Sequence, residues 1–263
     1  MKSHFEGCTF RPEIPEGCDL NTGRILLHCC CGPCSTAILE WMVDEGLRPG
    51  LFFSNSNIVP FDEYVKRHDE LARYAASFGL EVVDDDYDHA AWLEFVKSRC
   101  GSTEVLAGPE RGPRCLACFE FRLRRAAEYA VTHGYDILTT TLASSRWKDL
   151  KQVNEAGLLA VGSLPGEGIP PWDVSLRSTP PFASLCFAPV PPLNVPRVAV
   201  FQGGIPSPDK QNDKRLVWWG QNWRKGGLQE RRNFLISSCA LYNQTWCGCE
   251  FSSKLASRGQ DPA

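Results

Sequence analysis

Cysteine is the residue type in this sequence whose number and spacing could do chemistry. The chain of 263 residues holds 13 cysteines, and four of them lie in the run HCCCGPC at residues 28–34. Neighbouring cysteines cannot easily bridge to one another, so this run does not fit the disulfide framework of a secreted protein. In a protein of the cytoplasm, such a run indicates metal binding or redox catalysis.

Two cysteine elements could supply the ligands of a metal. The first is Cys30 and Cys31 with Cys34 three residues on, and the second is the C-x-x-C pair Cys115 and Cys118. Thiolates bind soft metals, and an iron–sulfur cluster is usually held by four of them from more than one loop. Two such elements about eighty residues apart suit a tetrahedral zinc ion equally well, so spacing alone leaves both metals open.

A third element, Cys247-Gly248-Cys249, favours electron transfer. A C-x-C pair can form a strained, easily reduced disulfide, and its glycine lets the backbone bend sharply. A redox-active dithiol near a metal site favours a cluster over zinc. The alternatives for this pair are a second set of metal ligands or two inert thiols. The other cysteines lack such spacing and are expected to pack as small hydrophobes without a chemical role: Cys8, Cys18, Cys29, Cys100, Cys186 and Cys239.

The elements that must position these cysteines alternate between strand and helix. The apolar patterns predict strands at residues 24–29, 51–55, 80–83 and 135–140, and helices at 35–45, 61–78, 88–98, 115–133 and 227–238. This alternation predicts an α/β fold, a Rossmann-like parallel sheet with helices on both faces. Cys30 and Cys31 follow the first strand, at the carboxyl end of the sheet, where such folds bind ligands. Cys115 and Cys118 begin a helix, whose dipole favours thiolate at that end.

Composition narrows the possible partners and location. No stretch approaches the roughly 20 uninterrupted apolar residues that cross a bilayer, and the N-terminus lacks the apolar run of a signal peptide. We therefore expect a cytoplasmic protein without a membrane partner. The net charge of -3 gives no overall attraction to nucleic acid, so any RNA contact would need a local basic patch.

The strand and helix alternation breaks at residues 162–213. This stretch holds eleven of the 19 prolines, and little regular structure survives such a density. We expect a poorly ordered insertion, and the alternative is a lid or partner-binding arm rich in polyproline. Regular structure is expected to resume at residues 216–219.

Five ordered blocks of the sequence resemble the QueH-type epoxyqueuosine reductases, the cobalamin-independent enzymes of tRNA queuosine synthesis. The blocks are LLHCCCGPCSTAILE, LFFSNSNIVPFDEYVKRHDELARYA, RCLACFEFRLRRAAEYA, ILTTTLASSRWKD and WRKGGLQERRNFLISSCALYNQTWCGCEFS. They cover most of residues 24–161 and 218–252, and the proline-rich stretch lies outside them. The family's fold is similar to the PP-loop (HUP-type) nucleotide-binding proteins. Cysteines stand here in place of the phosphate loop, so ATP use is not expected.

The resemblance implies roles for seven of the cysteines. Cys247 and Cys249 would form a redox-active pair, and Cys34 would be a ligand of an iron ion beside a cluster. Four further cysteines would hold that [4Fe-4S] cluster: Cys30, Cys31, Cys115 and Cys118.

The resemblance also implies an activity and an organisation. The activity is the two-electron reductive removal of the epoxide oxygen of epoxyqueuosine in the tRNA anticodon, which gives queuosine and water. The partners would be that tRNA and an unidentified electron donor. The organisation would be an N-terminal extension (1–22), one iron–sulfur reductase domain (23–161 and 214–252) interrupted by the insertion (162–213), and a C-terminal tail (253–263).

Two other functions stay open from the sequence. One is a zinc-binding module without catalysis. The other is a cluster-dependent tRNA thiolation enzyme, which the missing phosphate loop disfavours.

Basic and aromatic residues near the cysteine motifs could contact RNA by charge and by base stacking. Their alternative roles are ordinary, because most arginines are solvated and most tryptophans belong to a core. His28 could donate a proton, although a histidine that ends a buried strand is more often a hydrogen-bonded core residue. The candidates for RNA contact are Arg122, Arg124, Arg125, Lys148, Arg224, Lys225, Arg231, Arg232, Trp147, Trp223, Tyr242 and Trp246.

Overall fold

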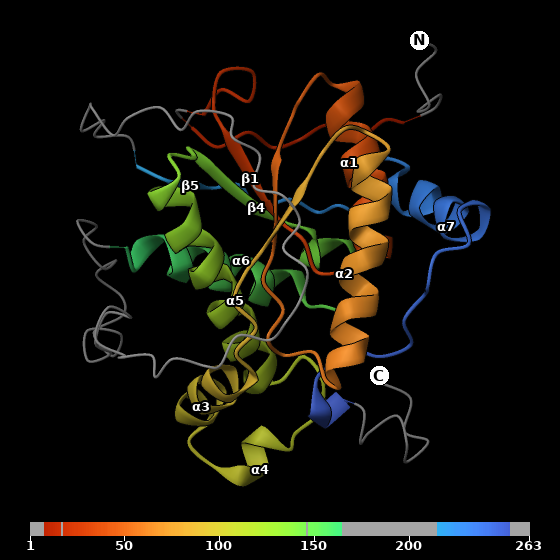
Figure 1. The fold of residues 1–263 in the computed structure, drawn as a ribbon. Coiled ribbons are helices and arrows are strands. Elements are labelled where there is room, and N and C mark those ends of the chain that lie inside the picture. Colours follow the sequence, from red (N-terminus) through yellow and green to blue (C-terminus); the bar gives the residue numbers. More distant parts are fainter. Residues whose placement is uncertain (1–7, 17, 146, 165–214, 253–263) are drawn as a thin grey trace. The chain divides into compact units, whose positions relative to one another are not determined.

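A five-stranded parallel sheet forms the centre of the computed structural model, which describes residues 8–16, 18–145, 147–164 and 215–252. β1 is the middle strand and pairs with β2 on one side and β4 on the other, so that His28 stands beside Phe52 and Thr140. The sheet confirms the predicted α/β class (Figure 1). The strands in sheet order are β3 (Val82–Asp84), β2 (Gly50–Phe53), β1 (Ile25–His28), β4 (Ile137–Thr140) and β5 (Val217–Trp218).

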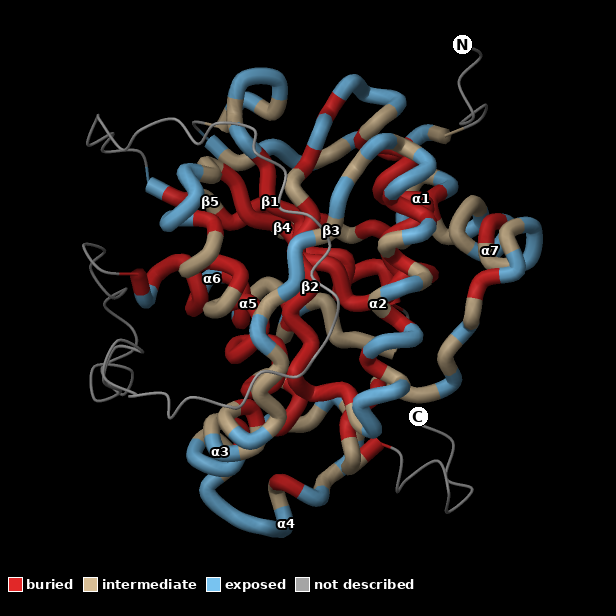
Figure 2. The backbone as a smooth tube through the Cα atoms, in the orientation of Figure 1, coloured by how far each residue is buried: buried red, intermediate tan, exposed pale blue. Residues whose placement is uncertain are grey.

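Helices cover both faces of the sheet, as expected for a sheet of parallel strands. On one face α1 packs against both α2 and α7, and on the other α5 packs against α3 and α6 (Figure 1). Buried residues concentrate in the strands and in the helix faces that meet them (Figure 2). The helices are α1 (Gly32–Asp44), α2 (Phe61–Ala76), α3 (His89–Cys100), α4 (Thr103–Leu106), α5 (Pro113–Thr132), the 3-10 helix η1 (Thr141–Ser144), α6 (Leu150–Gly162) and α7 (Leu228–Ser238).

Helices α1 and α6 differ from the sequence-based expectation, and the short helices α4 and η1 were not expected either. α1 begins at Gly32 instead of residue 35, because Pro33 suits the first helical positions, so Cys34 lies in the first turn of a helix. α6 was not expected at all. Asp149 is a typical N-cap residue and is visible in the sequence. In the structure its side chain accepts hydrogen bonds from the backbone N–H groups of Lys151 and Gln152.

A group of aromatic rings fastens the chain after the proline-rich stretch to the sheet. Trp223 lies with its ring centroid 5.3 Å from that of Phe10 and 5.8 Å from that of Trp41, and its Nε1 donates to the Thr140 carbonyl over 2.9 Å. Trp219 joins the same group. Trp223 therefore holds the segment before α7 against the end of β4.

The prediction for residues 162–213 falls almost wholly outside the described residues. Only residues 162–164, at the end of α6 and just beyond, are described, and the structure does not test the proposed insertion. Among the described helices, none is both long and apolar enough to cross a bilayer.

Candidate active site

A cavity of about 650 Å³ lies where the strands of the sheet end. Its wall includes Cys30 and Cys31 after β1, Asn55 after β2 and Leu142 after β4. These residues follow the carboxyl ends of three neighbouring strands, which is where open α/β sheets bind ligands. Cys247, far along the chain, lines the same cavity.

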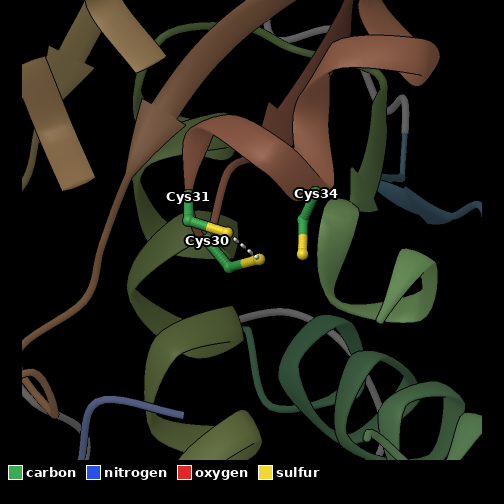
Figure 3. A group of neighbouring side chains, drawn as sticks. All are labelled: Cys30, Cys31 and Cys34. Carbon is green, nitrogen blue, oxygen red and sulfur yellow. Dashed lines mark hydrogen bonds between the residues drawn. The ribbon is translucent and has the colours of Figure 1, made fainter. Parts of the chain in front are cut away.

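Three thiols come together at the start of α1. The sulfur atoms of Cys30, Cys31 and Cys34 all lie within 4.8 Å of one another, and those of Cys30 and Cys31 are 3.9 Å apart (Figure 3). All three side chains are buried. Thr141 of η1 accepts a hydrogen bond from the backbone N–H of Cys30 and donates one to its sulfur over 3.4 Å.

Hydrogen bonds and a nearby charge make these thiols unequal. The neighbouring Cys31 and Cys34 thiols lower the pKa of Cys30, and the guanidinium of Arg122 adds to this against the opposing effect of burial. The same hydrogen bonding and burial raise the pKa of Cys31. The pKa of Cys34 is raised to about 11, chiefly by its hydrogen bond with Cys30. The group therefore favours one thiolate, on Cys30, in the metal-free protein.

The donor chemistry of this group fits a soft metal. Three sulfur atoms converge within 4.8 Å in a buried place, which suits iron or another thiophilic metal better than magnesium or calcium. The structure thus brings Cys30, Cys31 and Cys34 together as one possible metal site.

Cys115 and Cys118 lie in the first two turns of α5, as the sequence predicts, and both are buried. The pKa of Cys115 is raised to about 11, mainly by burial. Lys148 opposes this rise, and the charges of Cys247 and Cys118 add to it. The Cys118 charge likewise raises the pKa of Cys249. The C-x-x-C pair therefore lies near the C-x-C pair, while its sharing of one cluster with Cys30 and Cys31 stays a prediction.

The C-x-C pair forms a tight turn. The sulfur atoms of Cys247 and Cys249 are 3.4 Å apart, and Gly248 between them has a φ of 103°, a conformation that favours glycine. A Cβ at Gly248 would lie 2.9 Å from Nη1 of Arg67 and 3.0 Å from Cγ1 of Ile58. The bend predicted from the glycine is present, and no larger residue fits it without displacing its neighbours.

Arg67 of α2 holds this turn in place. Its side chain is 3% exposed and donates to the carbonyls of Cys247 over 3.1 Å and Trp246 over 3.3 Å, while its Nε donates to Glu63 over 2.7 Å. The backbone N–H of Val59 donates to the Gly248 carbonyl over 3.0 Å. No sequence pattern marks Arg67, because an arginine on an amphipathic helix is ordinarily a solvated residue.

A cation and a carboxyl group flank Cys247. The pKa of Cys247 is lowered by its hydrogen bond with Cys249 and by the Lys148 ammonium, against burial, and the pKa of Cys249 is raised. Burial lowers the pKa of Lys148, but Cys247, Cys115 and Glu110 raise it by more. Burial and Cys247 both raise the pKa of Glu110. The Ser252 hydroxyl donates a hydrogen bond to the Glu110 carboxylate and accepts one from the backbone N–H of Cys247. Ser252 therefore links Glu110 to Cys247.

Several candidates for RNA contact have structural roles instead. Trp223 is 1% exposed. Arg122 is buried and donates to the Ser54 carbonyl and to Asn55, although it also reaches the cavity wall. The other paired arginines are Arg124 with Glu120, Arg125 with Asp85 and Arg231 with Glu40. Five of the remaining candidates line the cavity: Trp147, Lys148, Arg224, Arg232 and Trp246.

The other three sequence candidates lie elsewhere. Lys225 is exposed, and the ammonium of Lys66 lies 3.3 Å from the ring centroid of Tyr242. His28 is fully buried and hydrogen bonds through its ring nitrogens to Thr140 Oγ1 and to the Ser54 carbonyl. Burial, with Arg122 adding to it, lowers the pKa of His28 to about 3, so the ring is neutral and belongs to the core.

The fold and the cavity define an α/β protein with a cavity lined by cysteine thiols at the carboxyl end of its sheet. The model of the family described as epoxyqueuosine reductase QueH matches residues 25–166 and 207–255. The chain therefore belongs to the QueH epoxyqueuosine reductases, a family of oxidoreductases.

Individual relatives agree with the family match. A QueH from Haemophilus influenzae is 31% identical over 240 residues, which cover 91% of this chain and 74% of the relative. A QueH from Acinetobacter baylyi is 28% identical over 248 residues, covering 94% of this chain and 88% of the relative. A QueH from Helicobacter pylori is 32% identical over 241 residues, covering 90% of this chain and 51% of the relative.

Replacing Lys148 with methionine is expected to raise the pKa of Cys247, because the thiolate loses its neighbouring cation. A rise of one pKa unit reduces the thiolate fraction about tenfold when the pH is below the pKa. Alkylation of Cys247 by iodoacetamide at neutral pH, followed by mass spectrometry, should slow by about that factor. Lys151→Met, at an exposed position of α6, is the control and should leave the rate unchanged. Equal rates in Lys148→Met and native protein would contradict the assigned charge interaction.

Replacing Arg67 with lysine is expected to loosen the turn at residues 246–249, because one ammonium cannot keep all three guanidinium hydrogen bonds. The loss should lower the free energy of unfolding by about 1–3 kcal/mol. Amide hydrogen exchange of residues 246–249 should accelerate more than exchange in β1. Arg73→Lys, at an exposed position of the same helix, is the control. Unchanged exchange at residues 246–249 would show that Arg67 does not hold the turn.

Proposed function

We propose that this chain reduces epoxyqueuosine in the tRNA anticodon to queuosine. The observation that carries the proposal is the cavity lined by Cys30, Cys31, Cys34 and Cys247, in a chain that belongs to the epoxyqueuosine reductase family. The reaction breaks two carbon–oxygen bonds, forms a carbon–carbon double bond and releases the oxygen as water. It consumes two electrons and two protons.

The Cys247 and Cys249 pair supplies both electrons in our proposal. Joining the Cys247 thiolate and the Cys249 thiol in one disulfide releases two electrons and one proton, and Glu110 supplies the second proton, which balances the reduction of one epoxide to an alkene and water. The 3.4 Å separation of the two sulfur atoms and the lowered pKa of Cys247 support this role, because thiolate is the reactive form. An external electron donor then returns the disulfide to the dithiol.

The metal group is a [4Fe-4S] cluster with an adjacent iron ion in our proposal. When bound, such iron would act as a Lewis acid toward the epoxide oxygen. The convergence of Cys30, Cys31 and Cys34 and the burial of the two thiols at the start of α5 support this assignment. Cys34 would hold the adjacent iron ion. The ligands of the cluster would be Cys30, Cys31, Cys115 and Cys118.

In our proposal a local group of basic residues binds the phosphate groups of the tRNA, because the chain as a whole carries a net charge of -3 and does not attract RNA. Arg224 and Arg232 line the cavity and lie near the exposed Lys225 in sequence. These cations suit phosphate groups on either side of a base that enters the cavity. The reaction takes place in the cytoplasm in our proposal.

Protein purified without oxygen and analysed for iron and sulfide tests the function directly. Incubation with epoxyqueuosine-containing tRNA and a chemical reductant should convert the nucleoside to queuosine, seen by mass spectrometry as the loss of one oxygen atom. Absence of conversion by iron-loaded protein would refute the function. A colourless protein that holds one zinc ion and converts nothing would identify the zinc-binding module instead.

Replacing Cys247 or Cys249 with serine is expected to abolish turnover while the iron and sulfide contents stay at the native level. Cys30→Ser should instead lower both contents, because it removes a ligand. Cys100→Ser is the control, since Cys100 lies at the end of α3 and does not line the cavity. Loss of iron from Cys247→Ser would make Cys247 a ligand and not a redox residue.

Glu110 is the proton donor to the departing oxygen in our proposal, because it lines the cavity and its pKa is raised by burial and by Cys247. An acid acts in its protonated form, so the rate should fall as the pH rises through the pKa of Glu110. Glu110→Gln should lower kcat about 10²–10⁴-fold and remove that limb of the pH profile. Glu104→Gln, at an exposed position of α4, is the control. A native pH profile in Glu110→Gln would exclude this role.

A further inference from the structure

Three ionisable groups of the cavity wall lie close together: the Cys247 thiol, the Glu110 carboxyl and the Lys148 ammonium. They come from three parts of the chain, namely the C-x-C turn, the segment between α4 and α5, and the segment between η1 and α6. Each lies within electrostatic range of the other two. A change of charge on one of them therefore affects the protons of its neighbours.

Ser252 holds the carboxyl group beside the C-x-C turn. Ser252 is 4% exposed, and its hydroxyl donates to Oε1 of Glu110 and accepts from the backbone N–H of Cys247 over 3.4 Å. Its own backbone N–H donates to the Cys249 carbonyl over 3.0 Å, so Ser252 is itself fixed on the turn. The carboxyl of Glu110 is thereby attached to the redox-active pair by a direct hydrogen bond.

Glu110 holds its proton while Cys247 is a thiolate. In the dithiol form the hydrogen bond from Cys249 lowers the pKa of Cys247, and the Lys148 ammonium adds to this against burial. Burial and the negative charge of Cys247 both raise the pKa of Glu110. A second negative charge beside the thiolate is unfavourable in a partly buried place, so the reduced site carries one anion and one cation.

Disulfide formation removes the charge of Cys247 and leaves Lys148 without that anion. A partly buried cation is unfavourable when it has no counter-ion. With the thiolate gone, burial alone still raises the pKa of Glu110, and Lys148 and the Ser252 hydrogen bond lower it. The carboxylate of Glu110 is therefore favoured in the oxidised protein, where it replaces the thiolate as the anion near Lys148.

We propose that Lys148 keeps one anionic partner through the reaction cycle, the Cys247 thiolate when the cysteine pair is reduced and the Glu110 carboxylate when the pair is a disulfide. The inference rests on the proposed function, in which these cysteines supply the electrons. It adds that the redox state of the pair controls the proton of Glu110, so that the acid releases its proton as the electrons leave.

The protons and electrons balance in both halves of the cycle. When the epoxide is reduced, the Cys247 thiolate and the Cys249 thiol form a disulfide and lose two electrons, while Cys249 and Glu110 each lose one proton. When an external dithiol cleaves that disulfide, its two electrons reduce the sulfur–sulfur bond and its two protons go to Cys249 and Glu110. The net charge of the site is the same in both states.

The equilibrium between iron-loaded protein and dithiothreitol counts these protons without any RNA substrate. Oxygen-free mixtures between about pH 5 and pH 8, where dithiothreitol keeps its protons, are quenched with acid and alkylated in denaturant. Mass spectrometry of the peptide that contains Cys247 and Cys249 then gives the reduced fraction.

Glu110→Gln should change the pH dependence of this equilibrium. Oxidation of dithiothreitol releases two protons, and the variant takes up only the one on Cys249, so its equilibrium constant for reduction should rise about tenfold per pH unit. Native protein takes up both protons while Glu110 titrates, and its constant should then stay level. The ratio of the native constant to the variant constant should therefore fall about tenfold or more as the pH rises.

Two further variants test the specificity of the effect. Glu104→Gln, at an exposed position of α4, is the control and should match native protein at every pH. Ser252→Ala should show a smaller fall in the ratio, because Glu110 is no longer held beside the turn. Infrared difference spectra of native protein should gain a protonated-carboxyl band on reduction of the pair, and Glu110→Gln should lack it.

A ratio that stays constant from about pH 5 to pH 8 would overturn the inference, as would native behaviour of Ser252→Ala or the absence of the carboxyl band from native protein. Turnover of epoxyqueuosine-containing tRNA is measured in parallel and separates the two proposals. Native turnover with a constant ratio refutes the charge exchange alone. Absence of native turnover refutes the proposed function, and the proton count is then still decided by the dithiothreitol equilibrium.

Discussion

The buried guanidinium of Arg67 is the interaction on which the assembled site depends. It joins α2 to carbonyls about 180 residues further along the chain, and it occupies the space beside Gly248 that a larger residue would need. A buried arginine is tolerated only when its donors are satisfied, and here a carboxylate and two carbonyls satisfy them. The C-x-C turn and α2 therefore stabilise each other, because the turn supplies two of the three acceptors of this buried arginine.

Electrostatics make the same cavity suitable for thiol chemistry. Buried thiols ordinarily hold their protons, since a low-dielectric environment disfavours thiolate. Arg122 and Lys148 offset this penalty for Cys30 and Cys247 respectively, and both cations line the cavity. Each thiolate also has a neighbouring cysteine whose thiol keeps its proton and hydrogen bonds to it. The arrangement favours one thiolate in each group of cysteines, which suits metal binding in one group and electron transfer in the other.

Local patterns predicted much of the fold, while long-range contacts could not be read from them. The alternation of strands and helices and the position of Cys30 after β1 follow from a few neighbouring residues, and the structure agrees with them. The helix at Leu150–Gly162 was missed although its N-cap is visible in the sequence. Arg67 could not have been selected, because its role depends on carbonyls of a distant segment that it meets only in the folded chain.

At the start of α1, a group of thiols occupies the place where nucleotide-binding α/β proteins hold phosphate. In nucleotide-binding α/β proteins the turn after the first strand uses backbone N–H groups and the helix dipole to hold phosphate. Here Cys31 stands at the N-cap position without a side-chain hydrogen bond to the helix, Pro33 removes one N–H group, and buried thiols fill the turn. The helix dipole that would favour phosphate equally favours thiolate. The thiol whose pKa is lowered, Cys30, lies just before this helix, so the turn that holds an anionic ligand in those proteins favours an anionic side chain here.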